Sequence, residues 1–363
     1  MSRGTRAVID LDALRHNLRV ARQAAPHSRV LAVVKADGYG HGLRAVAGAL
    51  AGLADGLGVA TFDEGMALRD SGVAGTVLLM EGVMNTAQLQ QAAGAGLDLV
   101  VHQPWQVSML LAARLSRPVR VWLKVNTGMH RLGMEPAGAA LFWQQLRASA
   151  NVTDLVLMSH MACADEPDHA MNRQQQEGFA ALVQQLAPAG ASLANSATTL
   201  NLPGGHYQWV RPGLMLYGAS PFANTPATEL DLRPVMQLEA RVISRMVVPA
   251  GGALGYGATW QAPRDTPVAV VAIGYGDGYP RHLSPAAQVL IKGVRCPVVG
   301  RVSMDMITVD VSAQSDAGPH TSVTLWGPGL PVEAVAAWAN TVNYELLCQI
   351  TGRVEREYRG GAE

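Results

Sequence analysis

The sequence predicts an α/β protein in which a (β/α)8 TIM barrel is followed by a C-terminal, mainly β domain. Eight short apolar runs recur within roughly 200 residues, and helical patterns lie between most of them. After about Asp231 the chain changes to short β-rich runs broken by Gly and Pro. We therefore expect a barrel over residues 10–230 and a β domain over residues 231–363, with residues 1–9 as a segment that could pair with the second domain.

The barrel elements follow from apolar runs and helical spacing. A helix is expected after Asp10, because Leu11, Leu14 and Leu18 recur at helical spacing behind an aspartate suited to capping. Short apolar runs are typical of fully buried strands. The eight expected strands are Val30–Val34, Gly58–Thr61, Val77–Met80, Leu97–Val101, Val119–Leu123, Leu155–Met158, Ser192–Ala194 and Trp209–Val210. The expected helices between them include Pro104–Leu115, Glu135–Ala148 and Asn172–Leu186.

The second domain is predicted from its β-rich runs. These runs include Val268–Ile273, Val289–Ile291 and Met306–Val311. Only Pro331–Ala339 has helical character in this part of the sequence. A further expected strand, Arg6–Ile9, precedes the first helix and could join this domain instead of the barrel.

The composition indicates a globular chain with no net charge at neutral pH when the histidines are neutral. Of its 363 residues, 49% are hydrophobic and 15% are charged, which suits large buried cores. Lys plus Arg and Asp plus Glu are 28 each, so no net charge favours nucleic acid or an anionic membrane surface. The expected partners are therefore small molecules or other subunits.

The cysteines and the first residues indicate a cytoplasmic, reducing compartment. Cys163, Cys296 and Cys348 are odd in number and widely separated, which argues against a disulfide framework and against a zinc site. Charged residues interrupt the N-terminal stretch where a signal peptide needs an unbroken apolar core. No apolar run is long enough for a membrane-spanning helix. We expect no membrane association and no metal.

Polar residues stand at or just beyond the ends of several expected strands. In a (β/α)8 barrel the chemistry gathers at the C-terminal strand ends, so these side chains should share one mouth. A lysine beside a Gly-rich segment also suits a Schiff base, although a solvated structural lysine remains the alternative when it is taken alone. The residues are Lys35, His102, Lys124, His160, Ser196 and Arg211.

Collinear motifs along nearly the whole chain resemble the alanine racemase family. They are AVVKADGYGHG at 32–42, LKVNTGMHRLGM at 123–134, SH at 159–160, NSA at 195–197, VRPGLMLYG at 210–218, LGYGATW at 254–260, IGYGDGYPR at 273–281, VGRVSMD at 299–305 and NYE at 343–345. The resemblance implies a pyridoxal 5'-phosphate enzyme with a barrel and a C-terminal β domain, acting as a homodimer with shared active sites. Such an enzyme would either supply D-alanine for peptidoglycan synthesis or take part in the catabolism of D-alanine.

The resemblance implies two catalytic bases. Lys35 would hold the cofactor as a Schiff base and move a proton at the α-carbon of alanine. Racemisation removes a proton from one face and delivers one to the other, so a second base is required. Tyr256, which lies between two glycines, resembles that base.

The resemblance also implies the residues that hold the cofactor. Arg211 would donate to the pyridine nitrogen and keep it unprotonated, because arginine does not readily release a proton. His160 would link Arg211 to the second base. The phosphate would be held by hydroxyl and backbone N–H groups; these belong to Tyr39, Ser196, Gly213, Leu214 and Tyr344.

Four further residues resemble substrate-side positions of the family. Arg131 would hold the phenolic oxygen of the cofactor and the substrate carboxylate. The Met304 amide would bind that carboxylate from the partner subunit, and Tyr275 would stand at the entrance of the site. Lys124 matches a lysine that is carbamylated in many members and orients the arginine.

Three alternatives remain open at this point. A basic amino acid decarboxylase of the same architecture would want an acidic residue in place of Arg211. A non-catalytic carrier of pyridoxal phosphate would resemble the barrel alone and leave the residues after Asp231 without a purpose. A racemase of serine or of several amino acids would use the same two bases. The sequence does not separate biosynthetic from catabolic roles.

Overall fold

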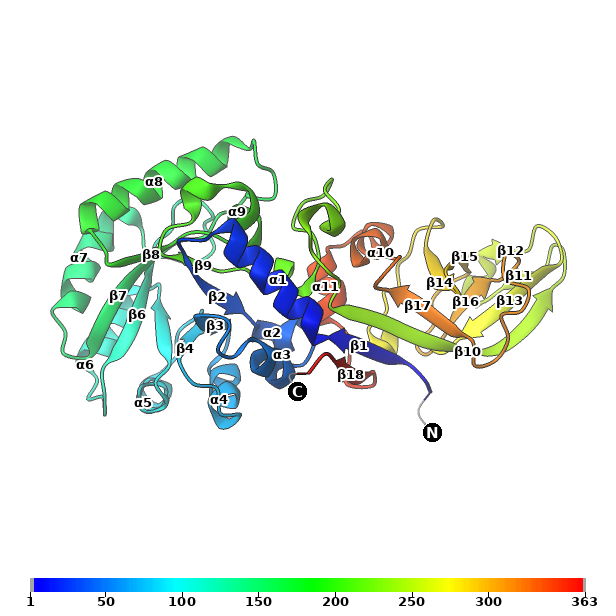
Figure 1. The fold of residues 1–363 in the computed structure, drawn as a ribbon, viewed down its shortest axis with the longest axis horizontal. Coiled ribbons are helices and arrows are strands. Elements are labelled where there is room, and N and C mark those ends of the chain that lie inside the picture. The colour runs from blue at the N-terminus through cyan, green and yellow to red at the C-terminus, as the bar shows by residue number, and fades with distance from the viewer. Residues whose placement is uncertain (1–2, 362–363) are drawn as a thin grey trace.

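The computed structural model describes residues 3–361, and Figure 1 shows a barrel at one end and a mainly β domain at the other. Eight parallel strands form the barrel sheet in the order β8-β7-β6-β5-β4-β3-β2-β9. The edge strands β8 and β9 meet where the Arg211 N–H donates to the Ala194 carbonyl at 3.0 Å. The strands are β2 (Arg29–Val33), β3 (Gly56–Val59), β4 (Thr76–Leu79), β5 (Asp98–Val101), β6 (Val119–Lys124), β7 (Val152–Met158), β8 (Gly190–Ser192) and β9 (Trp209–Val210).

All eight predicted barrel strands are confirmed, with ends that differ by a few residues. The interior is packed instead of open: Trp122 and Trp209 lie 5.3 Å apart between ring centroids, among Leu31, Leu78 and Val156. A filled barrel leaves the C-terminal strand ends as the place for a site.

Helices surround the barrel, as Figure 1 shows for α4 to α8. The first helix begins after Asp10, whose carboxylate accepts from the Asp12 and Ala13 N–H groups at 2.9 Å each, so the predicted cap is confirmed. The helices are α1 (Leu11–Ala24), α2 (Lys35–Tyr39), α3 (Leu43–Leu50), α4 (Phe62–Asp70), α5 (Thr86–Ala95), α6 (Pro104–Ala112), α7 (Pro136–Arg147), α8 (Ala170–Leu186) and α9 (Ser196–Asn201).

The second sheet forms the β domain. Its strand order is β13-β16-β15-β14-β17-β10-β1-β18, and β10 also pairs with β13, which closes six of the strands into a ring. The strands are β1 (Arg6–Asp10), β10 (Met236–Val248), β13 (Thr266–Val271), β14 (Gln288–Ile291), β15 (Val294–Val299), β16 (Ile307–Asp310), β17 (Ser322–Trp326) and β18 (Glu355–Arg359). A separate two-stranded ribbon consists of β11 (Ala253–Leu254) and β12 (Trp260–Gln261).

Strand β1 joins the second sheet and not the barrel. It pairs antiparallel with β10 and parallel with β18. The ion pairs of Arg6 with Glu239 at 2.9 Å and with Glu357 at 2.6 Å link the three strands on one face. Residues 6–10 are therefore held in the β domain.

The prediction of a single helical segment after Asp231 is wrong. Helix α10 (Val332–Ala339) is present as expected, and a second helix, α11 (Asn343–Cys348), follows it. Helix α11 has six residues and no side-chain cap, so it is too short to show helical periodicity in the sequence. In Figure 1 it lies between the barrel and the β domain.

Candidate active site

A cavity of about 500 Å³ opens at the C-terminal ends of the barrel strands. Its wall contains side chains that follow β2, β6, β7, β8 and β9, together with α11. All but four of the predicted site residues line it: Lys35, Tyr39, Lys124, Arg131, His160, Ser196, Arg211, Gly213, Leu214 and Tyr344.

Lys35 is held at the cavity by an unusual turn. It begins α2 directly after β2, and residues 36–39 all have positive φ, between 52° and 62°. The Arg356 guanidinium stabilises this turn by donating to the Gly40 carbonyl at 2.8 Å and pairing with the Asp37 carboxylate at 3.3 Å. The Gly-rich segment after Lys35 is therefore a fixed, left-handed turn.

Arg211 is the most deeply buried charge of the cavity, with 2% exposure. Its guanidinium donates to the Ser192 hydroxyl, to the Ser159 carbonyl at 2.6 Å and to the Leu193 carbonyl at 3.3 Å. Burial lowers its pKa to about 9, so it remains protonated at neutral pH. The buried Nε has no partner among residues 3–361 and is left for a group that enters the cavity.

His160 is neutral and has a defined tautomer. Burial first, and then the neighbouring Arg211 and Lys124 charges, lower its pKa well below the usual value. The Arg211 Nη2 lies 3.3 Å from His160 Nδ1. A guanidinium can only donate, so Nδ1 accepts and the imidazole proton sits on Nε2. His160 can thus pass a hydrogen bond from Arg211 toward the cavity.

Hydroxyl groups and backbone amides gather on one side of the cavity. The Ser196 hydroxyl accepts from the Gly213 N–H at 2.9 Å. A Cβ at position 213 would lie 2.5 Å from the Tyr39 hydroxyl, so only glycine permits this approach. The Tyr39 ring stacks on Tyr217 at 4.6 Å, and Tyr344 reaches the cavity from α11. This set of donors suits an anionic oxygen group.

Lys124 stands at the end of β6 among other cations. Burial lowers its pKa from 10.5 to about 7, and the Arg211, Arg131 and Lys35 charges act in the same direction. Glu81 opposes this effect. A large part of the Lys124 amine is therefore neutral, and nucleophilic, near neutral pH.

Arg131 is placed by a loop that returns to the end of β6. The Asn126 N–H donates to the Met134 carbonyl, and the Met134 N–H donates to the Lys124 carbonyl, both at 2.8 Å. The Asn126 side-chain oxygen also accepts from the His130 N–H at 3.0 Å. The loop is closed at both ends, and Arg131 between them lines the cavity.

Tyr256, Tyr275 and Met304 do not line this cavity; all three belong to the β domain. The Tyr256 side chain is 74% exposed, and Met304 is 53% exposed. Figure 1 places β11 and β12, the strands on either side of Tyr256 in the chain, at the end of the β domain far from α2. Within one chain, then, these residues are separate from Lys35.

His102 also stays outside the cavity wall, although it directly follows β5. Its Nε2 lies 3.2 Å from the Glu81 carbonyl, and the side chain is buried. The expectation that His102 shares the barrel mouth is therefore wrong, and a structural role fits this buried histidine.

Several residues of the site were not found from the sequence. Glu81, Asn195 and Cys348 line the cavity, while Ser192 and Ser159 hold Arg211 through a hydroxyl and a carbonyl. Ser192 offered a signal, because a serine inside an apolar strand is buried only with a hydrogen-bond partner.

Residues 3–361 contain neither a metal-binding cluster of side chains nor a helix suited to crossing a membrane. No group of three or more His, Cys, Asp or Glu side chains in this range is arranged to hold a metal ion. None of the helices described has both the length and the apolar character that crossing a bilayer requires.

Comparisons with known proteins agree with one another. Residues 9–221 match the family described as "Alanine racemase, N-terminal domain", and residues 235–358 match "Alanine racemase, C-terminal domain". An alanine racemase of Halorhodospira halophila is 46% identical over 358 residues, which cover 98% of this chain and 98% of that protein. The catabolic alanine racemase of Pseudomonas aeruginosa is 46% identical over 99% of each chain.

The biosynthetic alanine racemase of Pseudomonas aeruginosa is similar in sequence and in structure. Its sequence is 45% identical over 97% of this chain and 98% of that protein. Its crystal structure has a TM-score of 0.96 at 44% identity and covers 99% of this chain and 100% of that chain. The alanine racemase structure from Acinetobacter baumannii has a TM-score of 0.93 at 38% identity, covering 98% of this chain and 99% of that chain.

Proposed function

The chain belongs to the alanine racemase family, and on that premise we propose that it interconverts L-alanine and D-alanine with pyridoxal 5'-phosphate. Lys35 and Tyr256 are the two bases. The observation that carries the proposal is the cavity that brings the Lys35 amine and the buried Arg211 guanidinium to one barrel mouth. This arrangement argues against the decarboxylase alternative, because a decarboxylase would need a carboxylate where the buried Arg211 guanidinium lies.

The residues of the cavity fit the cofactor. The unpartnered Arg211 Nε offers a donor to the pyridine nitrogen, and the donors around Ser196, Gly213 and Tyr39 suit the phosphate. Lys35 supplies the amine for covalent attachment. When bound, pyridoxal phosphate withdraws electrons from the substrate and makes the proton on its α-carbon acidic.

Two bases on opposite faces of the α-carbon exchange the proton. Lys35 acts on one face, and Tyr256 of the partner subunit acts on the other. His160, whose Nδ1 accepts from Arg211, would donate its Nε2–H toward the oxygen of the partner's Tyr256 and link that base to Arg211. Arg211 keeps His160 in this tautomer. Because Arg211 holds its own proton, it would leave the pyridine nitrogen of a bound cofactor unprotonated, and the weaker electron withdrawal of that form would favour racemisation over side reactions.

The substrate carboxylate is held by positive charge and a backbone donor. Arg131, fixed by its closed loop, attracts the carboxylate from the barrel side. The Met304 amide of the partner subunit binds it from the other side, with Tyr275 of the partner at the entrance. The bulk of Tyr344 at the cavity leaves room for a small side chain, so alanine is the preferred substrate.

Lys124 is carbamylated in this proposal. A neutral amine adds CO2, and the lowered pKa makes the neutral form abundant. The product is an anion among Arg211, Arg131 and Lys35, where the unmodified ammonium is repelled. The carbamate would orient Arg131 toward the substrate.

We further propose a homodimer whose subunits complete each other's sites, located in the cytoplasm. The support is geometric: Tyr256 is 74% exposed, and β11 and β12, which flank it in the chain, lie far from α2 in Figure 1, so this tyrosine would serve the cavity of a second copy. Racemisation itself is tested by following the loss of optical rotation of L-alanine, L-serine, L-lysine and L-arginine with the cofactor-loaded protein. We expect L-alanine to lose rotation fastest. Unchanged rotation of all four would refute the function, and faster loss with serine would favour the serine racemase alternative.

A further inference from the structure

Two loops of the β domain, residues 274–278 and residues 303–306, carry Tyr275 and Met304. They are joined by backbone hydrogen bonds from the Tyr275 N–H to the Ser303 carbonyl at 3.1 Å and from the Gly276 N–H to the Met304 carbonyl at 2.8 Å. A Cβ at Gly274 would lie 2.2 Å from the Ser303 carbonyl oxygen, so the loops touch closely. The two side chains are thus carried by one joined unit.

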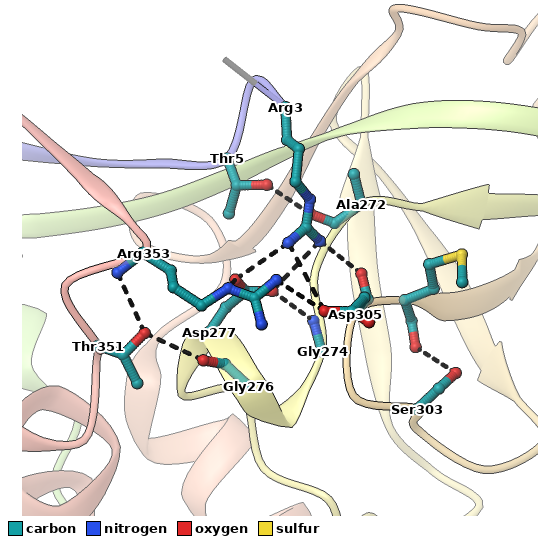
Figure 2. Close-up of polar contacts among 11 residues, drawn as sticks. Arg3, Thr5, Ala272, Gly274, Gly276, Asp277, Ser303, Asp305, Thr351 and Arg353 are labelled. Carbon is teal, nitrogen blue, oxygen red and sulfur yellow. Dashed lines mark hydrogen bonds and ion pairs between the residues drawn. The ribbon is translucent and has the colours of Figure 1, made fainter.

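A buried carboxylate lies behind this unit. Asp277 is 1% exposed, and its side chain accepts from the Gly274 N–H at 3.0 Å. It also pairs with Arg3 Nη1 at 3.3 Å and Arg353 Nε at 3.2 Å. Figure 2 shows the two guanidinium groups reaching the carboxylate from different segments of the chain. Such a buried charge is stable only while it stays paired.

Both arginines also contact the second loop. Arg353 Nη2 donates to the Asp305 carboxylate at 2.7 Å, and Arg3 Nη2 donates to the Asp305 carbonyl at 2.6 Å (Figure 2). Each guanidinium therefore bridges the loop of Tyr275 to the loop of Met304. We name Arg3, Asp277, Asp305 and Arg353 the Arg–Asp clamp.

The clamp is anchored in the core of the chain. The Thr351 hydroxyl donates to the Gly276 carbonyl at 3.1 Å, and the Thr351 N–H donates to the Asp277 carbonyl at 3.2 Å. On the other side, the Thr5 hydroxyl donates to the Ala272 carbonyl and ties the segment of Arg3 to the end of β13. Figure 2 shows the two hydroxyl contacts, from Thr351 to Gly276 and from Thr5 to Ala272, on different sides of the clamp.

Burial does little to fix Tyr275 and Met304, whose side chains are half-buried or exposed. Their place is set by the hydrogen bonds and ion pairs behind them. A shift of either loop would move the Met304 amide, whose geometry is coupled to the Gly276 N–H through the Met304 carbonyl.

We infer that the Arg–Asp clamp is a positioning network that aims the Met304 amide at the substrate carboxylate, and Tyr275 at the entrance, of the partner's site. The inference rests on the proposed function. The clamp touches no reacting atom, so its loss should weaken substrate binding more than it slows proton transfer. Positioning residues can change affinity through sub-ångström shifts of the groups they hold.

The test compares Asp305→Asn and Arg353→Ala with the matched control Asp316→Asn. Asp316 is another exposed aspartate of the β domain, paired with Lys292 at the β14–β15 turn. We expect both clamp variants to raise the KM for alanine about tenfold while kcat falls less than about threefold. The clamp positions groups that bind the substrate and does not touch the groups that transfer the proton. The control should change neither. Arg353→Lys should recover only part of the loss, since one ammonium replaces a fork that bridges two carboxylates.

Hydrogen exchange gives a second readout that is independent of activity. Backbone amides of residues 274–278 and 303–306 should exchange at least about tenfold faster in the clamp variants than in the Asp316→Asn protein. Unchanged exchange, or faster exchange with an unchanged KM, would overturn the inference. If the unmutated protein has no racemase activity, the proposed function fails; unchanged loop exchange in an active enzyme refutes the clamp alone.

Discussion

Replacing Lys124 with methionine should stabilise the cofactor-free protein at neutral pH, although it removes a residue of the site. Methionine keeps the unbranched apolar stem and deletes only the amine. The folded chain holds that amine, buried, among Arg211, Arg131 and Lys35, and these surroundings lower its pKa from 10.5 to about 7. Folding therefore disfavours the protonated form.

The size and the sign of the effect follow from this pKa change. One pKa unit corresponds to about 1.4 kcal/mol, so the shift is equivalent to a destabilisation of at most about 5 kcal/mol. Relaxation of the structure and penetration of water should reduce this destabilisation to about 2–3 kcal/mol. The unfolded chain binds the proton more tightly than the folded one between pH 7 and pH 10.5. The loss of folding stability caused by the Lys124 amine is thus fully present below pH 7. It shrinks as the pH rises and disappears above the pKa of 10.5 that the amine has in the unfolded chain.

The assay is thermal unfolding in CO2-free buffer at pH 6.5 and pH 9.5, with Lys292→Met as an exposed control. Lys124→Met should raise Tm by roughly 2–6 °C at pH 6.5, and its advantage in stability should fall to about a third at pH 9.5. Bicarbonate should stabilise the unmutated protein and leave the variant unchanged. A lower Tm for Lys124→Met at pH 6.5, or a difference that does not depend on pH, would refute the reasoning.

Three further predictions concern the cavity. Lys35→Ala should lose racemisation and the absorbance of covalently linked cofactor; a variant to which borohydride still fixes the cofactor covalently would contradict the assignment. Arg211→Glu should lower racemisation and raise the ratio of pyruvate to D-alanine released, because a carboxylate favours a protonated ring nitrogen and a longer-lived carbanion. An unchanged ratio would count against that role. Steady-state kcat/KM should be higher for alanine than for lysine or arginine, and equal values would exclude the small pocket.

The sequence predicted the barrel well, because each strand is a short apolar run and each run is buried in the fold. It also located most of the cavity, since residues such as Lys35 and Arg211 follow strands whose C-terminal ends converge. Helix α11 was missed because six residues show no period. The support of Arg211 by Ser159 and Ser192 was missed because it depends on which way each side chain points, and on which carbonyl lies opposite.

The Arg–Asp clamp could not be predicted from the sequence. Arg3 and Asp277 are separated by 274 residues, and ion pairs between distant segments leave no local pattern. Only the folded chain shows that Arg3, before β1, and Arg353, after α11, reach the same loops.

The central claim is that each site takes Lys35 from one subunit and Tyr256 from the other, and subunit exchange tests it most directly. Lys35→Ala and Tyr256→Phe proteins, each inactive alone, are mixed and allowed to exchange subunits. Each hybrid dimer then has one site without either base and one intact site. If half the dimers are hybrids, activity should recover to about a quarter of the unmutated rate. No recovery, where mass spectrometry shows that hybrids have formed, would contradict the shared site.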